Sequence, residues 1–154
     1  MSHSAEGLEG EYELTLVAAA GEAEGRSASG RLWLYANAPE MRALPAAAGG
    51  VRSDASAPLY GATDVAPEAV GGLRLGDPMS RDPEKPGVLL VQQNGRIVLR
   101  VGSEANRRGL LRFDGGYFVL RVQEVTDAGF AGTWASGLLE VQAQGHFCAT
   151  ALGD

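Results

Sequence analysis

The sequence predicts an all-β domain, an antiparallel β-barrel or barrel-like sandwich of about eight to ten short strands with two long loops. Short runs alternate apolar and polar residues with a period of two, which is typical of half-buried strands. The 22 glycines lie mostly between these runs, where the chain must turn. An Asn-Gly pair at 94–95 separates two β-branched runs, and this dipeptide favours the tight turn of a hairpin.

The length of 154 residues suits one domain with its own hydrophobic core. We expect a flexible segment over residues 1–9 and the domain over residues 10–154. Apolar residues make up 45% of the chain and charged residues 21%, which argues against intrinsic disorder, and no apolar run is long enough to span a membrane. The first residues lack the features of a signal peptide, so a cytoplasmic protein and a secreted protein with its signal segment removed both stay open.

The net charge of −6 is unevenly distributed. Residues 1–24 contain six glutamates and no Lys or Arg, whereas the rest of the chain carries 13 acidic and 13 basic residues. Binding to a phosphate backbone depends on clustered Lys and Arg, so a nucleic-acid partner is not expected.

The first half of the chain contains three expected strands and one long loop. Residues 11–20 and 29–38 alternate with period two and form an opening hairpin. Residues 39–58 are rich in Ala, Gly, Ser and Pro, which indicates a surface loop. A third strand is expected at 58–63, and Asp64 is placed to cap a helical turn that follows it.

The second half begins with a loop at 76–86, which contains three prolines. Strands at 87–93 and 96–102 then flank the Asn-Gly pair. A two-residue turn makes the paired residue numbers sum to 189, so Leu90 faces Leu99. Further strands are expected at 107–113, 117–125, 129–137, 138–142 and 145–152.

Several expected strands have one aliphatic face and one mixed face. If the aliphatic face points inward, the mixed face is too apolar to stay wholly in water and requires a partner or a covering segment. If the mixed face points inward, its arginines enter the barrel and can hold an anionic head group, as cavity arginines do in fatty-acid-binding proteins. Because burying unpaired arginines is costly, the first arrangement is preferred. The mixed face comprises Arg31, Trp33, Tyr35, Leu89, Val91, Arg96, Val98, Arg100, Tyr117, Val119, Arg121, Gln123 and Val125.

The triplet Gly132-Thr133-Trp134 resembles the Gly-x-Trp of lipocalins, a family of small calycin β-barrels. In that family the triplet lies on the first strand and its Trp plugs one end of the barrel, whereas here it lies about twenty residues from the C-terminus. The resemblance implies a carrier of small molecules with Trp134 as the floor of its cavity. Because Trp134 lies in a short apolar strand, the alternative is favoured: Trp134 is a structural residue of the core, and its indole N–H donates to a backbone acceptor.

His146 and Cys148 share one face of the last expected strand, because residues two apart point the same way. A zinc site needs three or four ligands, yet the only other histidine is His3 and there is no second cysteine. We therefore predict no metal site and expect Cys148 to be a buried thiol beside a hydrogen-bonded imidazole.

The loop at 76–86 gathers several ionisable residues, but no spacing among them singles out an acid–base pair. No glycine pattern of a phosphate-binding or dinucleotide-binding loop is present either. The sequence thus predicts a solvated loop, no catalytic residue and no cofactor, although an enzyme stays open as a third possibility. The loop residues concerned are Asp77, Arg81, Asp82 and Glu84.

We expect a non-catalytic interaction or structural module whose partner is a second copy, as in a homodimer, or another protein. The alternative is a lipocalin-like carrier of a small apolar or anionic molecule, for which the interior must enclose at least about 300 Å³. In both cases the expected binding face comprises Arg31, Trp33, Tyr35, Arg100, Tyr117 and Arg121.

Overall fold

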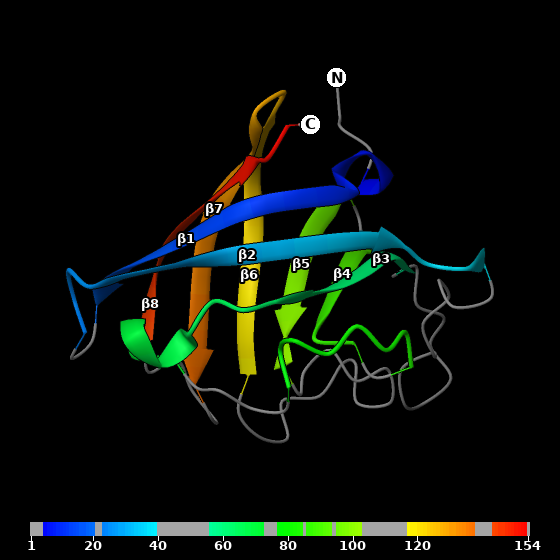
Figure 1. Cartoon of the computed structure of the whole chain (residues 1–154). Coiled ribbons are helices and arrows are strands. Elements are labelled where there is room, and N and C mark those ends of the chain that lie inside the picture. Colours follow the sequence, from blue (N-terminus) through cyan, green and yellow to red (C-terminus); the bar gives the residue numbers. More distant parts are fainter. Residues whose placement is uncertain are drawn as a thin grey trace, which may run out of the picture.

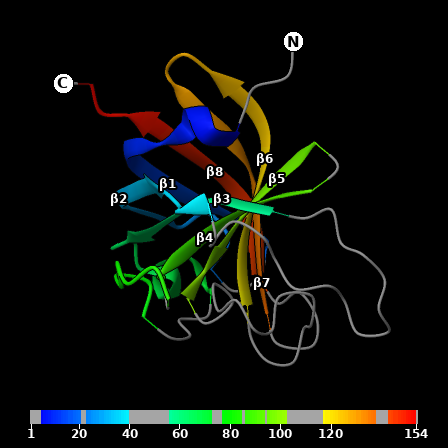
Figure 2. The ribbon, with the colours of Figure 1, turned by 90° about the vertical axis from the view of Figure 1, so that its right-hand side faces the viewer.

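Eight antiparallel strands close into a barrel in the computed structural model (Figures 1 and 2). Neighbours in the chain are neighbours in the barrel, and β1 also pairs with β8. This confirms the expected all-β class in its barrel form. The structure describes residues 5–20, 23–39, 56–72, 77–84, 86–93, 95–102, 117–137 and 143–153, so the strands expected at 107–113 and 138–142 lie outside it.

The observed elements differ from the expected ones mainly at two places, the loop before β3 and the N-terminal segment. β3 begins at Ser56, inside the loop expected at 39–58. A 3-10 helix, η1, occupies Ala5–Leu8, where a flexible segment was expected over 1–9. The strands are β1 (Gly10–Ala20), β2 (Ser27–Ala36), β3 (Ser56–Thr63), β4 (Val88–Gln93), β5 (Arg96–Val101), β6 (Tyr117–Thr126), β7 (Gly129–Gly137) and β8 (Ala143–Ala151).

The hairpin of β4 and β5 has the expected register. Leu90 faces Leu99, and the innermost pair, Gln93 and Arg96, leaves a two-residue turn. Gly95 has a φ of 76°, in the left-handed region that a type I′ turn requires and that glycine adopts without strain.

The aliphatic face of the strands lines the barrel interior, and the mixed face is its outer wall. Burying the aliphatic side chains gains roughly 25 cal/mol per Å², while the arginines stay outside, so this arrangement avoids the cost of unpaired interior charge. The interior cluster includes the aliphatic residues Leu14, Leu16, Leu32, Leu34, Leu90, Leu99 and Leu120 and the aromatic residues Phe118, Phe130, Trp134 and Phe147.

A 3-10 helix lies at each end of the barrel (Figure 1). At one end η1 buries Leu8, whose carbonyl accepts a hydrogen bond of 2.7 Å from the hydroxyl of Tyr12 on β1. At the other end η2, Pro67–Val70, buries Val70, and Gly72 after it lies so close to the Phe118 ring that a Cβ would overlap it. No helix among the described residues is long and apolar enough to cross a membrane.

Asp64 does not cap η2, contrary to the sequence-based expectation. The N-cap position is Ala66, which makes no side-chain cap bond. Asp64 instead accepts a hydrogen bond of 2.6 Å from the backbone N–H of Arg31, and thereby ties the segment after β3 to β2. The predicted cap was wrong because the helix begins later than expected, with Ala66 as its N-cap. The Asp64 carboxylate therefore bonds to the neighbouring strand instead.

Trp134 lies in the core, 1% exposed, where it stacks on Phe118 with ring centroids 5.2 Å apart and planes 8° from parallel. Its indole Nε1–H donates to the carbonyl of Val17 on β1 at 3.1 Å. Gly132, the other defining residue of the triplet, lies where β6 bulges between Val122 and Glu124. A Cβ at this glycine would overlap the carbonyl oxygen of Arg121, so strand packing accounts for both the Gly and the Trp.

Replacing Trp134 by Ala should lower the free energy of unfolding by about 3–5 kcal/mol, as truncation of core aromatics does. Trp134→Phe keeps a stacked ring but loses the bond to Val17, so it should cost less. Chemical denaturation of the three proteins tests this order, and an unchanged midpoint for the Ala variant would contradict the packing role.

Gly132→Ala should destabilise the fold by about 1–3 kcal/mol, because the added methyl group must push β6 and β7 apart. Gly7→Ala is the matched control, since a Cβ there meets nothing within 4 Å. The control should leave stability within about 1 kcal/mol of the wild type. Equal melting temperatures for the two variants would show that the close approach of the strands is not rigid.

Candidate functional site

Trp33 on β2 is the centre of a cluster on the outer wall. Glu11 on β1 is its register partner, and one Glu11 oxygen accepts a hydrogen bond of 3.1 Å from the indole Nε1–H. The same oxygen lies 3.3 Å from Nη1 of Arg31, which shares the outer face of β2. The guanidinium of Arg81, from the loop after η2, lies 4.5 Å over the indole ring. We call Glu11, Arg31, Trp33 and Arg81 the Trp33 cluster.

The contacts in the Trp33 cluster orient its members more than they stabilise the fold. The side chains of Arg31 and Glu11 are 50% and 44% exposed, and an ion pair in that setting contributes at most about 1 kcal/mol. An exposed cation–π contact, such as that of Arg81, adds about 0.5–1 kcal/mol. These interactions hold a half-buried indole between a carboxylate and a guanidinium, with part of its surface available to a partner.

Two tyrosines extend the cluster along the same wall. Tyr35 on β2 faces Tyr60 on β3, with ring centroids 5.6 Å apart at an interplanar angle of 48°. Tyr60 in turn packs against a small apolar cluster on the outside of the barrel, formed by Ala57, Leu89 and Val91. Trp33 and Tyr35 lie two residues apart on β2, and Tyr60 lies opposite Tyr35, so the three aromatic residues form one row across β2 and β3. Each of them is half-buried.

The apolar residues in the middle of the mixed face are covered, as expected for an outward face that is too apolar to stay wholly in water. Leu89 is 0% exposed, and Val91 and Val119 are 6% and 7% exposed, although all three point outward. The large hydrophobic residues that are exposed, among those the structure describes, are Val17 and Met79. The chain itself therefore covers the middle of the mixed face. A covering segment was one of the two alternatives expected, and a partner was the other.

The residues expected to form one binding face are only partly brought together. Arg31, Trp33 and Tyr35 are neighbours on β2. Arg100 lies on β5 between Leu89 and Val119, and Arg121 is exposed on β6, so β3 and β4 separate them from β2. Tyr117 is the first residue of β6, and its side chain lies outside the described part of the structure.

Sequence reasoning missed three members of the observed site: Glu11, Tyr60 and Arg81. The signal for Glu11 was present, because the opening hairpin was expected and only its register was needed to place Glu11 opposite Trp33. Tyr60 was within an expected strand but had no assigned face. Arg81 reaches Trp33 from a loop, and strand periodicity gives no information about such a contact.

His146 and Cys148 both point out of the barrel, so the expectation of a buried thiol is wrong. β8 alternates strictly, with Gly145, Phe147 and Ala149 inside and the residues between them outside. Cys148 is exposed, and its Sγ lies 3.7 Å from Oγ1 of Thr150. No group of three or more His, Cys, Asp or Glu side chains suited to a metal ion occurs within the described residues.

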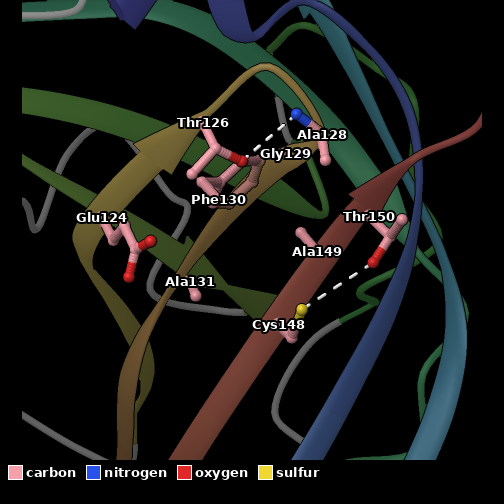
Figure 3. Close-up of a pocket in the computed structure, with 9 residues that line it drawn as sticks. All are labelled: Glu124, Thr126, Ala128, Gly129, Phe130, Ala131, Cys148, Ala149 and Thr150. Carbon is pink, nitrogen blue, oxygen red and sulfur yellow. Dashed lines mark hydrogen bonds between the residues drawn. The ribbon is translucent and has the colours of Figure 1, made fainter.

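A small hollow of about 160 Å³ opens beside Cys148, between the β6–β7 hairpin and β8 (Figure 3). Glu124 and Cys148 flank it because both are register partners of Ala131, whose methyl group leaves the space between them open. A larger hollow of about 400 Å³ lies next to it, toward η1, and the two share Thr126 and Gly129.

The acidic residues of the loop after η2 have local structural roles. Asp77 accepts a hydrogen bond of 3.1 Å from the backbone N–H of Met79, and Asp82 accepts one of 2.9 Å from that of Glu84. Both contacts are side-chain turns that order the loop from within. These turns fix the shape of the segment from which Arg81 reaches the Trp33 ring.

Because Cys148 is exposed, we expect it to react with a disulfide reagent such as dithionitrobenzoate in the native state, at a rate close to that in denaturant. Cys148→Ser should abolish the reaction. Strong protection of the native thiol would mean that another part of the molecule or a second copy covers this face of β8.

Comparison with known proteins finds no family model, no curated protein and no solved structure that matches this chain. Any inference about function therefore rests on the geometry of the molecule itself.

Proposed function

We propose that this protein is a non-catalytic β-barrel module that binds another protein through the outer wall of β1, β2 and β3. The partner that we expect first is a second copy of the chain. The observation that carries the proposal is the Trp33 cluster with its tyrosine row, an aromatic and arginine surface on a barrel whose interior is lined by a buried hydrophobic cluster.

The hydrophobic core inside the barrel favours a function on its outside. Phe118, Phe130, Trp134 and Phe147 belong to the interior cluster, together with leucines from β1 through β6. The buried residues Leu8 and Val70 of the two 3-10 helices belong to the same cluster, so it extends to both ends of the barrel. Function then depends on residues of the surface, as in other rigid scaffolds.

The composition of the outer site is that of a protein interface. Trp, Tyr and Arg are enriched among the residues that contribute most to binding energy, because they bury a large area and keep polar groups for directed contacts. The site also carries both signs of charge, with Glu11 beside Arg31 and Arg81. A surface of mixed sign can be complementary to itself, which a twofold dimer requires.

A lipocalin-like carrier is the second candidate, since the barrel has eight antiparallel strands and encloses the Gly-x-Trp residues. Two observations weigh against an anionic ligand inside it. Arg31 and Arg121 are exposed on the outer wall, and Trp134 is buried and stacked on Phe118. The hollow beside η1 is the feature that favours any small-molecule role.

Light scattering and sedimentation over a range of concentrations should detect a dimer of the wild type. Trp33→Ala should weaken it roughly tenfold or more, as for an aromatic residue at the centre of an interface, and Arg81→Glu should act in the same direction. Arg96→Glu, an exposed change on β5, is the control and should leave association unchanged. Val91 and Val119 are unsuitable for this test because both are buried within the chain.

Unchanged melting temperatures would show that the Trp33 and Arg81 variants keep the fold. A wild type that stays monomeric at all concentrations would refute self-association, and equal weakening by all three variants would refute the location of the interface.

A further inference from the structure

The hollow of about 400 Å³ at the η1 end of the barrel has the size of a small-molecule site, for which roughly 300–1,000 Å³ is usual. One wall is formed by η1 and the start of β1, and the other by the hairpin between β6 and β7. Figure 2 shows this hairpin and η1 at the same end of the barrel. The hollow is thus built from segments more than a hundred residues apart in the sequence.

The floor of this hollow is rigid and partly aromatic. Tyr12 lines it, and its ring packs edge-on against Phe130 with centroids 5.0 Å apart. The hydroxyl of Tyr12 is held by the carbonyl of Leu8, a second lining residue. Burial raises the pKa of the Tyr12 phenol, so the group stays neutral and continues to donate this bond. Binding here requires little reorganisation of the protein.

The charge around the hollow has a single sign. Glu9 lines one wall and Asp127 the other, and both are exposed. The adjoining small hollow adds Glu124. Neither Lys nor Arg is among the described residues that line either hollow. Among the described residues that line this hollow, Glu9 and Asp127 are the ones with carboxylates.

We infer that the hollow between η1 and the β6–β7 hairpin binds small organic cations, namely amines or quaternary ammonium compounds that carry an apolar body. The apolar body packs on Leu8, Tyr12 and Val125, while Glu9 and Asp127 on the two walls attract the positive charge. This site is separate from the Trp33 cluster and does not depend on the function proposed for it.

Benzyltrimethylammonium is the probe, and phenylacetate is its counterpart of opposite charge. Calorimetric titration of the full chain at low ionic strength should show saturable binding of the cation at one site and none of the anion. Glu9→Gln combined with Asp127→Asn should weaken binding roughly tenfold, since both charges across the hollow are removed. Glu24→Gln, an exposed change beyond the other end of β1, is the control and should have no effect.

A second variant tests the location without changing the charge. Gly7 lines the hollow, and a Cβ built on it meets nothing within 4 Å, so Gly7→Phe can place a ring there without a clash at the backbone. We expect this variant to keep its melting temperature and lose the cation. Trp33→Ala should bind as the wild type does, which separates this test from that of the outer wall.

Three results would overturn the inference. These are no saturable binding of the cation, equal binding of phenylacetate, and full binding by the folded Gly7→Phe variant. The first would remove the site, the second the charge selectivity, and the third the location.

Discussion

The pairing of β1 with β8 is the contact on which the rest of the structure depends. It runs from Tyr12 and Ala151 to Ala20 and Gln144, and it joins the two strands that would otherwise present open edges. Closure also encloses the aliphatic face on all sides. Trp134 reinforces this seam from within, because its indole bonds to the Val17 carbonyl on β1 while its ring packs on Phe118 of β6.

A closed barrel with a hydrophobic core separates stability from recognition. Interior side chains hold the wall in shape, so exposed residues on the outside can change without loss of packing, whereas the covered Leu89, Val91 and Val119 cannot. The Trp33 cluster illustrates this separation, since Glu11, Trp33 and Arg81 come from β1, β2 and a loop and meet only on the outer surface. The hollow beside η1 is a second such place, formed where a helix and a hairpin meet above the wall.

The predictable parts of the fold were those fixed by local pattern. Asn-Gly placed the hairpin of β4 and β5, and strict alternation separated the aliphatic face from the mixed face. Cys148 was assigned to the wrong side because Cys and Ala are small and occur on either face of a strand, so the pattern of β8 carried little information. The partners of Trp33 and the cover over Leu89 depend on tertiary contacts, which periodicity does not encode.

Joining the first strand to the last has a consequence for synthesis on the ribosome. β1 is made before its second neighbour, β8, from which more than a hundred residues separate it. During that interval its edge and its aliphatic face lack their final partner, and long loop closure slows the last step of folding. Glu11 and Glu13 lie on the outward face of β1, which has not yet paired with β8 at this stage. Charges at such positions disfavour pairing with another nascent chain. The glutamates of β1 thus suit a strand that must remain soluble until β8 has been made.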